Sequence, residues 1–209
     1  YPGGSPDVAS SANRVDKFTS QLRDEYGLEI TGSIDELLTK VDGILLESVD
    51  GRPHLEQARP VIAAKVPLFI DKPMAGSLED VIEIFRLAED AGVPCWSSSS
   101  LRFCPDIIGM RGNPEVGDVL GCDAFSPCSL EKHHPDLYWY GVHGVEILFT
   151  IMGKGCQTVR RVQTADTEFV TGIWDDGRIG TFRGLRSGPH DYGAMVYGSK
   201  SIVPSGRYT

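Results

Sequence analysis

The stretch "PLFIDKPMAG" at residues 67–76 places a lysine directly after an apolar run that is typical of a buried strand. Asp71, Lys72 and Pro73 therefore fall where that strand ends, and ligands of parallel α/β sheets bind beyond the carboxyl ends of the strands. A lysine between apolar walls loses solvation, which lowers its pKa toward values useful for acid–base chemistry. Pro73 also keeps Lys72 out of helical backbone angles. The simpler alternative is that Asp71 and Lys72 are solvated charges that end a strand.

A second candidate lies in "YWYGVHGVEILF" at residues 138–149. His143 and Glu146 are three residues apart and share one helical face, which also carries Trp139. A histidine can serve as a general base, although a histidine in an apolar helix is more often a core residue. A metal site is a further alternative, but the spacing of the candidate ligands matches no common zinc motif. Those ligands would be His133, His134, His143 and Glu146.

The predicted secondary structure that positions these residues differs between the two halves of the chain. Helical patterns at residues 13–27, 52–65 and 77–92, and a capping-box pattern at residues 33–36 that opens a short helix, alternate with buried-strand patterns at residues 41–48, 66–70 and 93–98. This alternation predicts βα units around a parallel sheet. If the first two strands are neighbours, Ser48 and Lys72 lie on the same edge of that sheet.

The second half of the chain predicts a different architecture. A short helix at residues 101–110 and a strand at 117–127 precede one long apolar helix at 136–153. Strand-like runs follow, and "WDDGRIGTF" carries the Asp-Gly signal of a hairpin. We therefore expect an antiparallel sheet with one long helix, and a domain boundary between residues 98 and 99.

Composition excludes some classes of function. The net charge of −9 argues against nucleic-acid binding, which needs clustered lysine and arginine. No apolar run approaches the ~18 residues that span a bilayer, so we expect no membrane partner. The five cysteines are odd in number and lack CxxC spacing, which favours reduced thiols in a cytoplasmic protein.

Three motifs together resemble the Gfo/Idh/MocA family of nicotinamide-dependent oxidoreductases. The segment 41–73 is similar to the family's strand, cofactor loop ending in histidine, helix and Glu-Lys-Pro strand end, with Asp71 in place of the glutamate. The segment "SSSSLRFCP" at 97–105 resembles the entry to the family's second domain. The segment "GVHGVEILFTIMG" at 141–153 resembles its Gly-x-His-x-x-Asp helix, with Glu146 in place of the aspartate.

The resemblance implies an α/β protein. Residues 1–98 would form a Rossmann-type parallel sheet that lacks its first βα unit, and residues 99–209 an α+β domain with an open, mainly antiparallel sheet. The implied cofactor is NAD or NADP, and the implied reaction is hydride transfer between the nicotinamide and a small-molecule sugar, polyol or similar carbinol. Because self-association commonly covers an open sheet face, we expect a homodimer or homotetramer.

The same resemblance implies roles for individual residues. Lys72 would hydrogen-bond the reacting hydroxyl, and His143 would act as general base. Weaker candidates for contact with the substrate are Arg102, Trp139 and Glu146. The residues implied in cofactor binding are Ser48, Val49, Asp50, His54, Asp71, Lys72 and Pro73.

Two departures from the family leave alternatives open. The dinucleotide fingerprint GxGxxG is absent from the chain, and Trp139 stands where many members carry an aspartate. Asp136 or Glu146 could replace that aspartate. The alternatives to a dehydrogenase are a non-catalytic sensor that binds the dinucleotide without turnover, and NAD-dependent glycoside cleavage at a related site.

Overall fold

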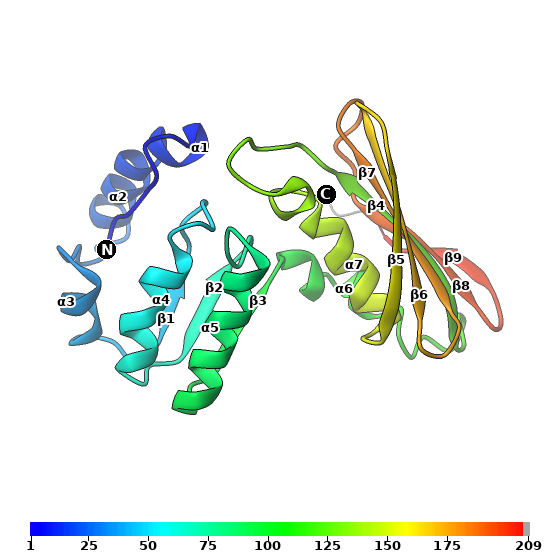
Figure 1. Ribbon diagram of the computed structural model, residues 1–209, viewed down its shortest axis with the longest axis horizontal. Helices are drawn as coiled ribbons and strands as arrows, with labels where there is room; N and C mark the ends of the chain where they lie inside the picture. The colour runs from blue at the N-terminus through cyan, green and yellow to red at the C-terminus, as the bar shows by residue number, and fades with distance from the viewer. Residues whose placement is uncertain (207–209) are drawn as a thin grey trace. The chain divides into compact units, whose positions relative to one another are not determined.

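The computed structural model describes residues 1–206 and divides into two compact units (Figure 1). The first unit comprises Tyr1–Ser98 together with the loop Lys132–Pro135, and the second comprises Ser99–Glu131 and the residues from Asp136 onward. The sequence did not predict that this loop joins the first unit. Within the described residues, no helix is long and apolar enough to cross a membrane.

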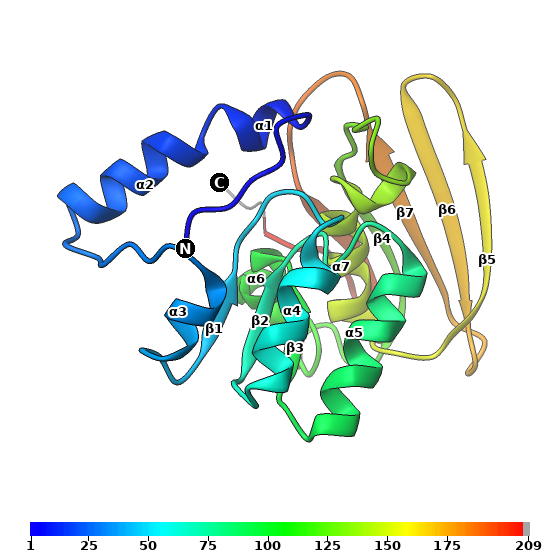
Figure 2. The same ribbon diagram turned by 60° about the vertical axis from the view of Figure 1, so that its left-hand side comes forward.

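The first unit is built on a three-stranded parallel sheet in the order β1-β2-β3, as the βα pattern predicted. The strands are β1 (Ile44–Leu46), β2 (Leu68–Asp71) and β3 (Cys95–Ser98). The helix α4 (His54–Ala63) packs against β1 and β2, and α5 (Leu78–Ala91) packs against α4 (Figure 2). The core between them contains Ile44, Leu68, Ile70, Ile62 and Ile84.

Local capping signals set the ends of α5 and of the short helix α3 (Ile34–Leu38). The Ser77 hydroxyl accepts the Asp80 N–H at the start of α5, and Gly92 ends that helix with a φ of 67°. Such a left-handed end favours glycine. At α3 the Ser33 hydroxyl accepts the Glu36 N–H, as the capping-box pattern predicts.

Two further helices, α1 (Ala9–Ala12) and α2 (Val15–Asp24), precede α3. The helix predicted at residues 13–27 is therefore realised as α2 with shorter ends. In α4 the helix continues through Pro60.

The second unit is built on a six-stranded sheet in the order β5-β6-β7-β4-β8-β9. Neighbouring strands are antiparallel except β4 and β7, which are parallel, so the sheet is mainly antiparallel as predicted. The strands are β4 (Val119–Pro127), β5 (Cys156–Gln163), β6 (Thr167–Trp174), β7 (Ile179–Leu185), β8 (Gly193–Gly198) and β9 (Ile202–Pro204).

The prediction of one long helix over residues 136–153 is wrong. The structure has a 3-10 turn, η2 (Asp136–Tyr138), and a separate helix, α7 (Val142–Met152), which begins after Gly141. The helix α7 packs on β4, β7 and β8 (Figure 1). This packing needs Gly144, because a Cβ there would lie 2.2 Å from a ring carbon of Phe182.

The entry to the second unit consists of two short helical turns. The 3-10 turn η1 (Ser100–Phe103) is followed by α6 (Pro105–Ile108), and both contact α7. The core of the unit lies between these helices and the sheet. It contains Leu101, Ile107, Ile147, Ile151, Trp174 and Phe182.

Candidate active site

Lys72 lies directly beyond the carboxyl end of β2, where Asp71 is paired with Ser98 of β3. Its Nζ is 3.7 Å from Oδ2 of Asp71, and its side chain is 24% exposed. The ammonium is therefore held at the strand end and is still open to a ligand. The peptide bond between Lys72 and Pro73 is cis.

A second carboxylate, Glu47, follows the neighbouring strand β1. Partial burial and the negative charge of Asp71 raise the pKa of Glu47, whereas the charge of Lys72 opposes the rise. Two carboxylates and one ammonium therefore influence one another at this edge of the sheet. The sequence predicted the roles of Asp71 and Lys72 but gave none to Glu47.

The predicted cofactor loop after β1 is held by His54. The ring of His54 is fully buried, with Nε2 2.9 Å from the Ser48 carbonyl oxygen and Nδ1 3.1 Å from the Met74 carbonyl oxygen. Burial lowers the pKa of His54. The histidine thus ties the end of β1 to the loop after β2. Its direct contact with a cofactor stays a prediction.

Asp50 is also buried, at 1% exposure, and forms an ion pair with Arg52 at 2.7 Å. Although burial opposes ionisation, hydrogen bonds from Arg52 and Ser5 hold the pKa of Asp50 far below its usual range. The backbone N–H of the next residue, Gly51, donates to Nε2 of His134 at 3.1 Å. The loop Lys132–Pro135 therefore supports the predicted cofactor loop, a contact across 83 residues that no local pattern signals.

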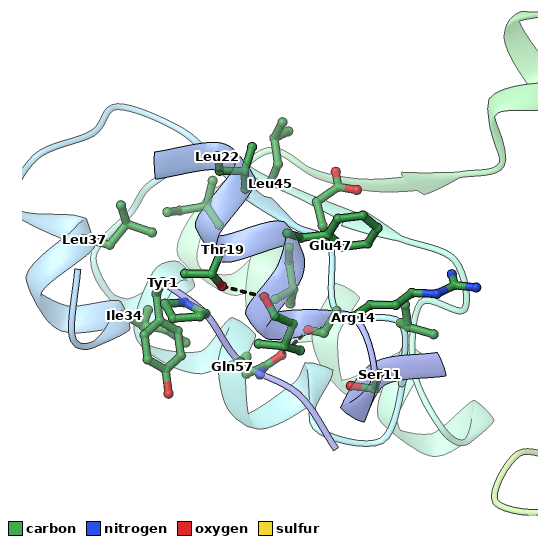
Figure 3. Close-up of a pocket in the computed structure, with 18 of the residues that line it drawn as sticks. Tyr1, Ser11, Arg14, Thr19, Leu22, Ile34, Leu37, Leu45, Glu47 and Gln57 are labelled. Carbon is green, nitrogen blue, oxygen red and sulfur yellow. Dashed lines mark hydrogen bonds between the residues drawn. The ribbon is translucent and has the colours of Figure 1, made fainter. Parts of the chain in front are cut away.

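A cavity of about 630 Å³ lies beside β1 in the first unit (Figure 3). Ser48 and Val49 line it at the strand end, and the Ser48 hydroxyl donates to Oε1 of Gln57 at 2.9 Å. Phe18 and Leu22 of α2 give it an apolar wall, and Arg14 adds a cation. Ligand cavities of this size commonly combine apolar walls with a few polar groups.

The lining of this cavity can be compared with the chemical groups of a dinucleotide. An apolar wall suits a flat ring, and a guanidinium with hydroxyl and amide groups suits ribose and phosphate. The residues that line the cavity at the end of β1 therefore fit such a cofactor. Asp71, Lys72 and Pro73 lie at the next strand end and do not line the cavity.

His143 is the second residue of α7, and Ser99 orients its ring. Oγ of Ser99 lies 2.7 Å from Nδ1 of His143 and also accepts the Leu101 N–H. Ser99 is only 1% exposed, so it serves as an orienting group and is inaccessible as a nucleophile. The sequence placed Ser99 in a serine run but gave no signal for this contact, which joins residues 44 apart.

Two tyrosines flank His143, which is only partly buried. The centroid of the Tyr140 ring is 4.9 Å from that of the imidazole, and the centroid of the Tyr192 ring is 6.0 Å away, both edge-on. The Tyr192 hydroxyl donates to the Tyr140 hydroxyl at 3.0 Å. Two aromatic rings whose hydroxyl groups are joined by a hydrogen bond therefore pack against the imidazole. Neither tyrosine was predicted as part of a site.

Two of the three predicted substrate residues meet in the second unit. Arg102 forms an ion pair with Glu146, whose side chain is 11% exposed. Trp139 lies half-buried between η2 and α7. Asp136, one suggested replacement for the family aspartate, is engaged in an ion pair with Arg161.

The structure also bears on the metal alternative and on the cysteines. In the part of the chain that the structure describes, no three His, Cys, Asp or Glu side chains are grouped so as to hold a metal ion. All five cysteines are free. Burial raises the pKa of Cys122 to about 12, which makes its thiolate scarce.

Comparison with known proteins supports the motif-based resemblance. Residues 8–99 match the model of an oxidoreductase family with an NAD-binding Rossmann fold, the Gfo/Idh/MocA family. This match confirms the predicted resemblance, and NAD as the family's cofactor agrees with the prediction of NAD or NADP. No curated protein matches the chain.

Solved structures resemble both units. GenD2 from gentamicin A biosynthesis, in complex with NAD, has a TM-score of 0.75 at 20% identity, over 91% of this chain and 62% of its own. The WlbA dehydrogenase from Bordetella pertussis, with NADH and UDP-GlcNAcA, has a TM-score of 0.72 at 17% identity, over 90% and 63%. The apo scyllo-inositol dehydrogenase from Lactobacillus casei has a TM-score of 0.75 at 16% identity, over 91% and 64%.

The extent of these matches limits what they show. At such identities the likeness establishes the fold, a Rossmann-type parallel sheet followed by an open mixed sheet. The chain spans less than two thirds of the length of these three proteins.

Proposed function

We propose that the chain forms part of an NAD-dependent dehydrogenase that acts on the CH–OH group of a sugar, polyol or similar carbinol. The observation that carries the proposal is Lys72, held beyond the end of a parallel strand inside the segment that matches an NAD-binding oxidoreductase family. The inositol dehydrogenase and the NAD and NADH complexes among similar structures support this substrate class and cofactor.

The residues that would hold the cofactor lie at two strand ends. Ser48 and Val49 line the cavity at the end of β1, and Asp71, Lys72 and Pro73 follow β2. Asp50 and His54 would act indirectly, since they are buried and fix the loop. When bound, a nicotinamide supplies the hydride acceptor or donor, and the protein supplies orientation and proton transfer.

Two groups of this chain are suited to move the proton. The Lys72 ammonium can donate a hydrogen bond to the reacting oxygen. If Nδ1–H of His143 donates to Ser99, the lone pair on Nε2 can accept a proton from the substrate hydroxyl. A positioned acid–base group of this kind contributes about 10²- to 10⁴-fold in rate.

The test measures binding and turnover together. The intact protein is titrated with NAD by calorimetry and then assayed with a panel of sugars and polyols at the absorbance band of reduced nicotinamide. If the protein is a dehydrogenase, it binds NAD, and the band of reduced nicotinamide appears with at least one carbinol. If NAD binds but the band appears with none of the carbinols, the proposal is contradicted and the sensor is favoured. If products of glycoside cleavage appear without net reduction of the cofactor, glycoside cleavage is favoured.

The free cysteines bear on where the protein works. Because the cysteines are odd in number and lack CxxC spacing, we propose that the protein is cytoplasmic.

A further inference from the structure

A second cavity, of about 560 Å³, lies within the second unit around the end of α7. Three cationic residues line it, Arg102, Arg111 and Lys154. This concentration of positive charge stands out in a chain whose net charge is −9. It is not part of the site described above, apart from Arg102.

Most of this positive charge is not neutralised by the protein. Arg102 is paired with Glu146. Within residues 1–206, Arg111 and Lys154 have no ion-pair partner. The Asp175 carboxylate lies close to Gly155 but does not line the cavity.

One structural explanation is that these cations neutralise the negative end of α7. The last two carbonyl groups at that end, however, accept hydrogen bonds from other donors. Arg178 donates to the Met152 carbonyl at 3.1 Å, and the Trp174 indole N–H donates to the Gly153 carbonyl at 2.9 Å. Arg111 and Lys154 are therefore not needed to cap the helix.

Gly153 brings Arg111 close to the backbone. A Cβ on Gly153 would lie 3.4 Å from Nη1 of Arg111, so the guanidinium stands directly over the bare glycine at the cavity wall. Gly153 has a φ of 80°, which other residues rarely adopt. The Arg111 guanidinium is therefore in van der Waals range of the Gly153 position at the cavity wall.

We propose that this cavity binds the phosphoryl group of a small phosphorylated molecule. A guanidinium binds phosphate through two parallel hydrogen bonds, and a lysine ammonium adds a point charge. Phe149 and Ile108, which are 40% and 52% exposed, form an apolar wall beside the cations. That wall suits the ring of a nucleotide or the apolar face of a sugar.

The position of the cavity allows two sources for the phosphoryl group. Residues 150–153 follow His143 by 7 to 10 positions, so they lie about 10–15 Å from it along α7 at the rise of an α-helix. The group can belong to a separate ligand or to the far end of a long substrate that reaches His143. Only the second source rests on the proposed dehydrogenase function.

The experiment titrates the intact protein with inorganic pyrophosphate and, separately, with UDP-N-acetylglucosamine. Arg111→Ala and Lys154→Ala are each expected to weaken both affinities by about tenfold or more, because each removes a charged hydrogen-bond donor. Lys17→Ala, which removes an exposed cation from α2 in the first unit, is the matched control and leaves both affinities unchanged.

A further variant separates the two sources. If the phosphoryl group is the far end of a substrate, His143→Ala weakens the binding of UDP-N-acetylglucosamine but not the binding of pyrophosphate. If it belongs to a separate ligand, His143→Ala changes neither affinity. The proposal is overturned if neither probe binds at millimolar concentration, or if Arg111→Ala and Lys154→Ala bind both probes like the control while remaining folded.

Discussion

At the scale of single residues, Ser99 decides how His143 presents its ring. The serine is buried, and its Oγ lies 2.7 Å from Nδ1 of His143. Ser99→Ala removes this partner and lets the imidazole rotate, and a small misplacement of a catalytic group can cost about 10²-fold. We expect kcat to fall by about 10- to 100-fold with KM little changed.

Steady-state kinetics and the pH profile of kcat check this expectation. The neighbouring Ser100→Ala is the control, since Ser100 is exposed. If Ser99→Ala keeps both the wild-type kcat and the wild-type pH profile, Ser99 does not position the base.

His54 predicts a pH dependence of stability. Because burial lowers its folded-state pKa, the unfolded chain binds the additional proton, beginning near the unperturbed value of about 6.5. The stabilisation is complete above that pH and declines as the pH falls toward the folded-state pKa. Asp50, whose pKa is also lowered, contributes a further loss of folding stability only below about pH 4.

Urea unfolding of the wild type and of His54→Asn at pH 7.5 and pH 5 measures this effect. The free energy of unfolding of the wild type is expected to fall between the two pH values, and the fall in His54→Asn is expected to be smaller. Equal changes in both proteins would show that His54 does not titrate on unfolding.

At the scale of helices and strands, local signals were sufficient for the first unit. Ser33, Ser77 and Gly92 sit at the helix ends that their side chains or backbone angles favour, and the strands follow from buried apolar runs. Non-local features escaped prediction. The parallel pairing of β4 with β7 and the contact of His134 with Gly51 depend on residues far apart in the chain.

The error at residues 136–153 has a similar origin. Apolar composition predicted a continuous helix, but the chain turns at η2 and restarts at Gly141. Gly141 lies against the side chains of Leu137 and Cys128, where a Cβ would be 2.9 Å and 3.1 Å away. The tertiary contact, which the sequence pattern does not report, sets the start of α7.

Strand β6 carries the buried carboxylate of an ionic cluster that links it to β5 and to Arg186, the residue directly after β7. Glu168 is fully buried, accepts from Arg161 at 2.6 Å through two nitrogens, and is also paired with Arg186. Removing one member of a buried ion pair costs about 3–5 kcal/mol, because the partner charge stays buried.

Glu168→Ala is therefore expected to lower the free energy of unfolding by about 3–5 kcal/mol in urea titrations. The control is Glu25→Ala on the exposed surface, for which we expect a change within about 0.5 kcal/mol. A loss below about 1 kcal/mol for Glu168→Ala would mean that the cluster adds little to the sheet.

At the scale of the whole molecule, no helix within residues 1–206 packs on one of the two faces of the sheet of the second unit. On that face, opposite α7, the register aligns a row of residues across β6, β7, β4, β8 and β9, which is apolar except at β4, where Gly121 lies between the side chains of β7 and β8. Its members are exposed and comprise Ile173, Ile179, Tyr197 and Ile202. We propose that a second copy of the chain covers this row, in a homodimer or homotetramer.

Sedimentation of the intact protein tests this proposal. The double variant Ile173→Asp/Ile179→Asp places two charges on the row and is expected to be monomeric at concentrations where the wild type self-associates. Ile82→Asp, at an exposed position of α5, should leave the assembly unchanged. A monomeric wild type, or a double variant that still assembles, would contradict the proposal.

The three motifs together indicated the family. They also indicated two positions of the candidate site, Lys72 at a strand end and His143 on a helix. They did not reveal the groups that hold those positions. Ser99 and Arg52 had no predicted role, and His134 was considered only as a metal ligand, so the positions of all three groups follow only from the fold.

The most direct test of the whole account is the turnover of Lys72→Met with NAD and a carbinol that the wild type oxidises. We expect kcat to fall by about 10²- to 10⁴-fold and the affinity for NAD to fall much less, because the ammonium chiefly serves the reacting oxygen. Lys17→Met is the control for loss of a lysine charge. Wild-type turnover in Lys72→Met would contradict the account.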